Sequence, residues 1–114
     1  MENIQIYYGK KNFDVQKAER FFKERGVKYQ ACDLLKRPMG RRELEALVNC
    51  VGLEGAIDQT SKAYLECPAR FSGSDTSLLN ALANDQRMLR TPIVRFGRHF
   101  SVGYAPEIWQ TWLK

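Results

Sequence analysis

The stretch IYYGKKNFDVQKAERFF, residues 6–22, decides the fold because a strand pattern runs through a short basic turn into a helix pattern. Alternating residues from Ile4 to Tyr8 are typical of a half-buried strand, and Gly9 ends that run. From Asp14 onward the apolar residues recur at helical spacing, with charged residues between them. The apolar stripe of this predicted helix consists of Val15, Ala18, Phe21 and Phe22.

A second strand is expected soon after this helix. Gly26 stands where a glycine commonly ends a helix. The stretch VKYQACDLL, residues 27–35, then alternates again and predicts the strand. Strand, helix and strand within about 30 residues form a βαβ unit, so the two strands should run parallel with a right-handed crossover.

The middle of the chain, about residues 40–89, is predicted to be a helical insert. Its first helix has Leu44, Leu47 and Val48 at helical spacing, is expected to run to about Asn49 and is closed by Gly52. A short helix is expected over residues 61–66. Pro68 and Gly73 mark a loop, and residues 74–77 offer N-caps for a helix whose apolar positions are Leu78, Leu79, Leu82 and Met88.

The last quarter predicts a β-hairpin followed by a helix. TPIVRFGRHFSVG, residues 91–103, reads as two strands that turn at Gly97-Arg98. Pro106 suits the first turn of a final helix. The expected apolar stripe of that helix is Ile108, Trp109, Trp112 and Leu113.

The order of these elements predicts a thioredoxin-like α/β fold. It has a four-stranded mixed sheet, flanking helices and a helical insertion, and we expect one domain over residues 1–114. The Thr91-Pro92 pair directly before the third strand supports this prediction, because a proline there is often cis in this fold. Pro92 is therefore a cis-proline candidate.

Composition and charge favour an ordinary globular domain. The chain has 114 residues, of which 44% are hydrophobic and 27% charged, so a packed core is expected and disorder is not. The net charge of +5 is explained by solubility or by a local anion site. Basic residues are scattered rather than gathered between aromatics, although Arg37, Arg41 and Arg42 lie close together. Direct binding of nucleic acid is therefore not expected.

Membrane, metal and cofactor signals are missing from the sequence. It holds no apolar run of about 18 residues, and its beginning lacks a signal-peptide pattern. Cys32, Cys50 and Cys67 form no CxxC pair, and His99, the one histidine, cannot complete a zinc site with them. We expect no cofactor, no metal, no membrane contact and a reducing, cytoplasmic location.

Two long segments resemble arsenate-reductase-like proteins of the ArsC and Spx group. They are IYYGKKNFDVQKAERFFKERGVKYQACDLLKRPMGRREL, residues 6–44, and LRTPIVRFGRHFSVGYAPEIW, residues 89–109. With the insert between them, the resemblance covers nearly the whole chain. It implies a thioredoxin-like fold with a helical insertion.

The resemblance also implies that a nucleophile is missing. Active arsenate reductases place a cysteine at the start of the first helix, where free N–H groups and the helix dipole lower the thiol pKa and hold an oxyanion. Asn12 stands at that position, and an amide has no ionisable nucleophile. The family arginine before the late proline is replaced by Thr91, with Arg90 one step earlier, and the arginine of the last strand by Tyr104.

Two further family features are absent. In the insert, where the family carries another arginine, AIDQTSKAY offers Asp58, Gln59 and Lys62. Spx-type regulators bind RNA polymerase, and some sense oxidation through CxxC at the junction, where this chain has Asn12 and Val15. Classical arsenate reduction and this redox switch are therefore not expected, whereas binding of a protein partner is compatible with the sequence.

Three interpretations of Asn12 stay open. Asparagine is a good N-cap, because its side-chain oxygen accepts a hydrogen bond from an N–H two or three residues on. Alternatively, the helix start forms part of an anion site made by Lys10, Lys11, Asn12, Arg90 and Thr91. In the third interpretation, Asn12 stands where close relatives carry cysteine or selenocysteine.

The remaining candidates have simpler explanations. Cys32 and Cys50 are predicted to be buried, and Cys67 is predicted to be the most exposed thiol. His99 is expected to be a solvated residue at the hairpin tip. Trp109 and Trp112 are expected in the core and at its rim.

Three functions follow. The leading hypothesis is an ArsC-like protein that has lost the redox cysteine and binds a small anion or a protein partner without catalysis. The second is a thiol oxidoreductase linked to glutathione or glutaredoxin, whose nucleophile position is Asn12 here or whose thiol is Cys67. The third is an Spx-like adaptor associated with transcription.

Overall fold

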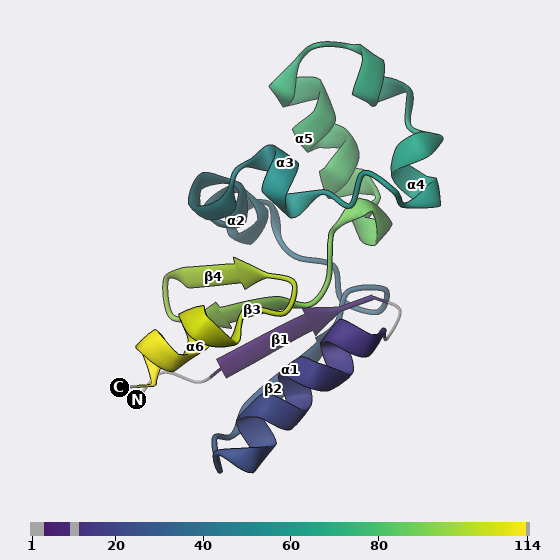
Figure 1. Cartoon of the computed structure of the whole chain (residues 1–114). Helices are drawn as coiled ribbons and strands as arrows, with labels where there is room; N and C mark the ends of the chain where they lie inside the picture. Colours follow the sequence, from purple (N-terminus) through teal and green to yellow (C-terminus); the bar gives the residue numbers. More distant parts are fainter. Residues whose placement is uncertain (1–3, 10–11, 114) are drawn as a thin grey trace. The chain divides into compact units, whose positions relative to one another are not determined.

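The computed structural model describes residues 4–9 and 12–113 (Figure 1). The chain divides into two compact units. We call Met1–Asp33 with Thr91–Lys114 the sheet unit, and Leu34–Arg90 the helical unit. Helices in the described part of the chain are too short or too polar to cross a membrane.

The sheet unit contains a four-stranded mixed sheet in the order β2-β1-β3-β4. The strands are β1 (Ile4–Tyr8), β2 (Tyr29–Asp33), β3 (Ile93–Phe96) and β4 (His99–Val102). β1 pairs with β2 in parallel and with β3 antiparallel, and β3 and β4 form the antiparallel hairpin. The predicted βαβ unit, hairpin and α/β fold class are confirmed.

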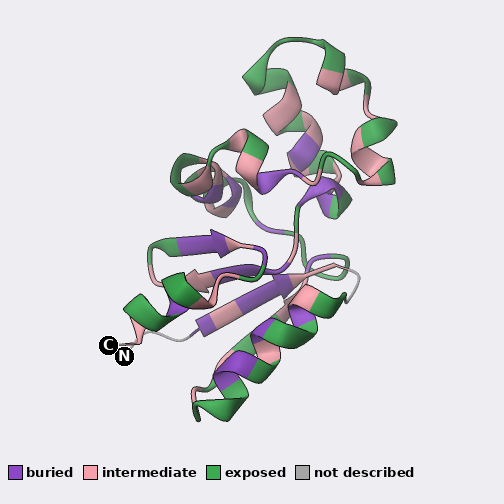
Figure 2. Cartoon of the chain, viewed as in Figure 1, coloured by how far each residue is buried: buried purple, intermediate pink, exposed green. Residues whose placement is uncertain are grey.

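The first helix, α1 (Phe13–Glu24), forms because its apolar residues fall on one face. Val15, Ala18, Phe21 and Phe22 are buried, as predicted, and Figure 2 shows the opposite face exposed. Gly26 follows the C-cap residue of the helix and has a φ of +66°, which residues with a Cβ rarely adopt. The N–H groups of Gly26 and Val27 donate to the carbonyls of Lys23 and Phe22, as in a Schellman motif.

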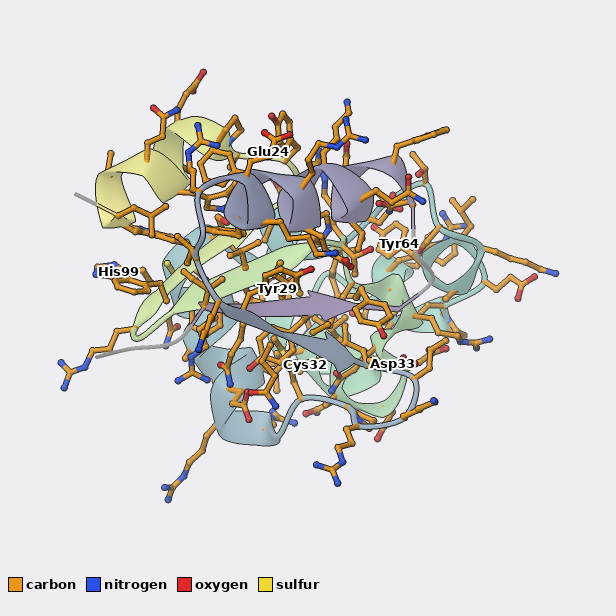
Figure 3. All side chains as sticks on the ribbon, turned by 90° about the horizontal axis from the view of Figure 1, so that it is seen from below. Glu24, Tyr29, Cys32, Asp33, Tyr64 and His99 are labelled. Atoms are coloured by element: carbon orange, nitrogen blue, oxygen red, sulfur yellow. The ribbon has the colours of Figure 1, made fainter. Side chains whose placement is uncertain are left out.

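The last helix, α6 (Pro106–Trp112), lies with α1 on one face of the sheet (Figures 1 and 3). The core between them and the sheet is formed by Ile4, Ile6, Ala18, Phe21, Phe22, Val94 and Trp109. The indole N–H of Trp109 donates to Ser101 Oγ at 2.7 Å, so the buried polar atom is satisfied. Ile108 is 45% exposed, so the predicted apolar stripe was wrong there: Ala105, not Ile108, packs with Trp109 and Trp112.

The second strand is shorter than its sequence pattern. The prediction covered residues 27–35, but β2 spans Tyr29–Asp33. Its hydrogen-bonded partner is β1, and the pairing ends where Tyr8 lies opposite Asp33. Once β1 turns away, the apolar residues after Asp33 have no strand to pair with.

The helical unit contains short helices with side-chain caps. They are α2 (Arg41–Val51), α3 (Leu53–Ala56), α4 (Lys62–Leu65), η1 (Pro68–Phe71), α5 (Asp75–Asn84) and η2 (Gln86–Met88). Ser61 and Ser74 cap α4 and α5, which confirms the expected helix starts. Met88 lies on η2 rather than on α5, because the extended backbone of Asp85 ends α5 first.

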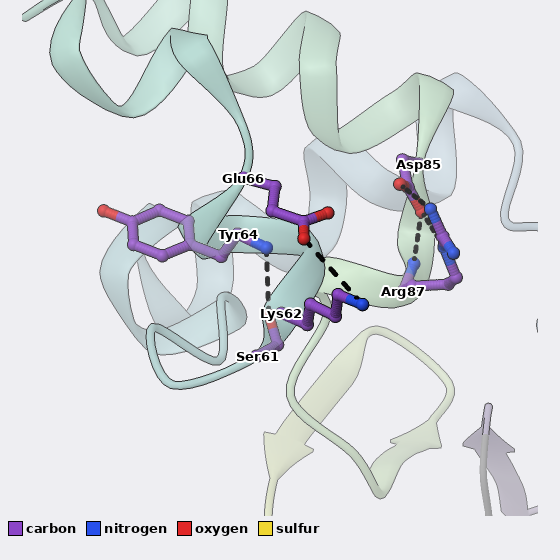
Figure 4. A network of polar contacts seen from close by, with 6 residues as sticks. All are labelled: Ser61, Lys62, Tyr64, Glu66, Asp85 and Arg87. Atoms are coloured by element: carbon purple, nitrogen blue, oxygen red, sulfur yellow. Dashed lines mark hydrogen bonds and ion pairs between the residues drawn. The ribbon is translucent and has the colours of Figure 1, made fainter.

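Hydrogen bonds and an ion pair of polar side chains stabilise the helical unit. Figure 4 shows the Ser61 cap on the N–H of Tyr64 and the pairing of Arg87 with Asp85, whose shortest N–O distance is 2.7 Å. The Arg87 hydrogen bond holds the pKa of Asp85 below its ordinary value. Deeper in the unit, the Gln86 amide accepts from Met39 N–H at 2.7 Å and donates to Met39 C=O at 2.8 Å.

Candidate binding site at the start of helix α1

The start of α1 is a capped helix terminus. Asn12 has an extended backbone, and its Oδ1 accepts a hydrogen bond of 2.9 Å from the N–H of Val15. Its carbonyl accepts from Gln16 N–H at 3.1 Å and so begins the helix ladder. Asn12 therefore fills the N-cap role expected from its residue type, and its amide NH₂ has no acceptor among the residues that the structure describes.

The electrostatics of this terminus are mixed. The N–H groups of Phe13 and Asp14 have no acceptor among the residues that the structure describes, and they carry the positive end of the helix dipole. Asp14 places a half-buried carboxyl in the same turn, where it interacts favourably with the dipole. An incoming anion would have to share this positive end with Asp14.

The sheet brings two further loops to the same end as the start of α1. Tyr7 pairs with Ile93, so the chain leaves β1 beside the place where it enters β3. The Thr91-Pro92 peptide bond is cis and immediately precedes β3. The Pro92 carbonyl accepts from Gly103 N–H at 2.8 Å, which joins this loop to the segment before Tyr104. Topology thus gathers the segments that contain Asn12, Thr91 and Tyr104 at one end of the sheet.

The described residues do not place Lys10, Lys11 or Arg90, the other members of the predicted anion site, beside Asn12 and Thr91. Lys10 and Lys11 lie outside the described residues. Arg90 is exposed and belongs to the helical unit, where its backbone N–H donates to Ala56 C=O at 2.9 Å. The site formed by Lys10, Lys11, Asn12, Arg90 and Thr91 stays a prediction.

The three thiols do not follow the expected order of exposure. Cys50 is exposed, whereas Cys32 (labelled in Figure 3) and Cys67 are half-buried. The predictions of a buried Cys32 and of Cys67 as the most exposed thiol were therefore wrong. The predicted burial of Cys50 was wrong because the buried stripe of α2 runs through Leu44 and Leu47, and Cys50 lies on its flank. Within residues 4–9 and 12–113, no three His, Cys, Asp or Glu side chains gather closely enough to hold a metal ion.

The aromatic candidates have structural roles. His99 is exposed, as expected, and begins β4, with its ring stacked on Trp112 at a centroid distance of 6.2 Å. Trp109 is fully buried and Trp112 partly buried, which confirms the core and rim positions.

A groove between α1 and α6 was not predicted from the sequence. Lys17 and Arg20 line it from α1, and Tyr104 and Gln110 line it from the C-terminal segment. The helical pattern did place Lys17 and Arg20 on the outer face of α1. Their meeting with Tyr104, far away in the chain, had no signal in the sequence.

Comparisons with known proteins agree with this architecture. The YffB protein has a similar structure. The match covers 98% of this chain and 100% of that one, with a TM-score of 0.87 and 18% identity. The chain also matches an arsenate reductase from Vibrio cholerae over 96% of this chain and 97% of that one, with a TM-score of 0.83 and 21% identity. These likenesses show that the chain has a thioredoxin-like fold with a helical insertion.

The family follows from the sequence. The chain belongs to the ArsC family, whose sequence model matches residues 7–112. A relative is the global transcriptional regulator Spx 2 of Oceanobacillus iheyensis, 27% identical over 103 residues that cover 88% of this chain and 76% of that protein. The resemblance inferred from the sequence is confirmed.

Proposed function

We propose that this member of the ArsC family is a binding module without redox catalysis, which binds a small anion or a protein partner. The observation that carries the proposal is the Asn12 cap on the N–H of Val15. At this helix start the family resemblance requires a thiolate.

The chemistry of the cap opposes a nucleophilic role. An amide side chain cannot be deprotonated to give a nucleophile as a thiol can. The Asn12 oxygen, moreover, already accepts a hydrogen bond from the helix. A thiolate in the same place would be stabilised by the dipole and by the N–H groups of Phe13 and Asp14. The helix start is thus suited to hold a negative charge but supplies no atom that attacks.

The competing function is a thiol oxidoreductase that uses another cysteine. Its test is arsenate reduction with glutathione and glutaredoxin as electron donors, measured on the unchanged chain and on Asn12→Cys. We expect no turnover above background for the unchanged chain. A gain of activity in Asn12→Cys would show that only the nucleophile is missing. Gln16→Cys, an exposed position one turn further along α1, is the matched control and should stay inactive.

One outcome would overturn the proposal. Arsenate turnover by the unchanged chain that disappears in Cys67→Ser or Cys50→Ser would show that a second thiol performs the chemistry. Separate tests of the two cysteines are needed because Cys50 is exposed and Cys67 is half-buried.

The ligand at the helix start would be a small oxyanion. Its binding groups would be the N–H groups of Phe13 and Asp14 and the Asn12 amide, with Lys10, Lys11, Arg90 and Thr91 as the predicted surrounding residues. Titration with phosphate, followed by amide chemical shifts, should then move the Phe13 and Asp14 signals in a saturable manner. Shifts that grow linearly with phosphate would contradict an anion site.

A second candidate function is that of an adaptor associated with transcription. The 27% identity to a global transcriptional regulator favours it. Binding of purified RNA polymerase by the unchanged chain would support this function, and its absence in a direct pull-down would reject it.

A further inference from the structure

The groove between α1 and α6 is a concave surface within the sheet unit. It has a volume of about 600 Å³, which falls in the range of sites that hold small ligands or a few residues of a peptide. Phe21 and Pro106 contribute apolar surface to it, and Tyr104, a residue that is 46% exposed, contributes its ring. This ring packs edge-on against Trp109 at 5.6 Å between centroids, so the core supports it.

The charge of the groove is unbalanced. Lys17, Arg20 and Arg25 line it, against a single carboxylate from Glu24. No ion pair joins these four side chains to one another or to any other part of the described chain. The groove therefore carries an excess of positive charge that the described residues leave uncompensated.

Aromatic rings hold two of these cations in place. The Arg25 guanidinium lies over the Phe21 ring, 3.8 Å from its centroid, and donates to the Phe21 carbonyl at 3.3 Å. The Lys17 ammonium lies 5.4 Å from the centroid of the Tyr104 ring. A cation over an aromatic face keeps its charge and loses part of its freedom, so it is better prepared to meet an anion.

We propose that this groove binds an acidic segment of a protein partner. Carboxylates of the segment would pair with Lys17, Arg20 and Arg25, and an apolar side chain would pack on the exposed ring of Tyr104. Charge complementarity argues for this occupant. Nucleic acid fits less well, because its regular phosphates need a longer basic track and would meet Glu24 inside the groove.

The inference deepens the proposed binding role, and it uses residues other than Asn12. Its failure is therefore separable from failure of the proposed function. Arsenate turnover by the unchanged chain would reject the absence of catalysis and leave the groove untouched. Loss of peptide binding in a groove variant leaves the Asn12 experiments unaffected.

The test uses a fluorescent peptide with alternating glutamate and leucine, and a control peptide in which glutamine replaces every glutamate. Fluorescence anisotropy on the full chain should show saturable binding of the acidic peptide, weakened by salt. Arg20→Glu should weaken it about tenfold through charge repulsion. Lys23→Glu makes the same change in charge on α1 outside the groove and should have a much smaller effect.

The apolar contact has its own variants. Tyr104→Ala should weaken binding, whereas Tyr104→Phe should retain it, because the ring and not the hydroxyl makes the contact. Circular dichroism of each variant verifies the fold. The proposal would be overturned if the neutral peptide bound as well as the acidic one, or if Lys23→Glu weakened binding as much as Arg20→Glu. It would also be overturned if single-stranded DNA displaced the acidic peptide at a lower concentration than unlabelled acidic peptide does.

Discussion

The Oδ1 atom of Asn12 accepts a 2.9 Å hydrogen bond from the N–H of Val15, three residues further along α1. The same residue stands where the family resemblance predicts the cysteine of active arsenate reductases. A side chain that caps a helix satisfies one of its unpaired donors, which is a structural contribution. This hydrogen bond gives Asn12 a structural role that requires no catalytic function.

Removing this cap should destabilise the protein. Asn12→Ala is expected to lower the free energy of unfolding by about 0.5–2 kcal/mol, because the N–H of Val15 loses its acceptor. Asn12→Asp should retain most of the stability, since a carboxylate accepts the same bond and interacts favourably with the dipole. Urea denaturation measures both. Equal stability of Asn12→Ala and the unchanged chain would show that the cap contributes nothing.

The buried pair of Trp109 and Ser101 gives a second prediction. Ser101→Ala leaves the indole N–H without its acceptor in the core and should cost about 1–3 kcal/mol. In a Trp109→Phe background that donor is gone, so the same serine change should cost clearly less. Equal costs in the two backgrounds, measured by urea denaturation, would contradict the assigned hydrogen bond.

The double hydrogen bond between Gln86 and Met39 should stabilise the helical unit. Gln86→Leu removes the partner of both backbone groups of Met39, at a cost of about 1–3 kcal/mol for each group left unsatisfied. Gln59→Leu, at an exposed position of the same unit, should change stability by about 0.5 kcal/mol or less. A similar effect of both substitutions on urea denaturation would contradict the buried contact.

A pH dependence is expected at Tyr29. Burial, the negative charge of Glu19 and a 3.2 Å hydrogen bond to it raise the pKa of the Tyr29 phenol above its ordinary value of 10.0. The raised pKa contributes stability that is complete below pH 10 and is lost as the pH rises through the folded-state value.

The Tyr29 prediction separates its causes. Glu19→Gln should lower the pKa of Tyr29 without returning it fully to the ordinary value, because burial is the largest cause. NMR titration of the ¹³Cζ signal of Tyr29 measures this. An unchanged pKa in Glu19→Gln would contradict a contribution from the carboxylate.

Local patterns explain why much of the fold was predictable. The stripe of α1, the glycine at its end and the serine caps of α4 and α5 are encoded within a few residues each. The length of β2 was not, because it depends on where β1 stops pairing. The Gln86 contact joins residues 47 positions apart, and residue types alone give no sign of such a partner.

The candidate site was likewise predictable only where its features depend on local sequence. The capping role of Asn12 follows from its residue type and its place before a helical stripe. The exposure of Cys50 depends on which face of α2 is buried, and the groove depends on Tyr104 meeting α1 across the fold. Tertiary packing decides both features.

The most direct test of the central claim is the rate of arsenate-dependent glutathione oxidation by the unchanged chain in the presence of glutaredoxin. The account predicts a rate equal to that of the mixture without the chain, because residue 12 offers no nucleophile. A rate that rises in proportion to the concentration of the chain would contradict it.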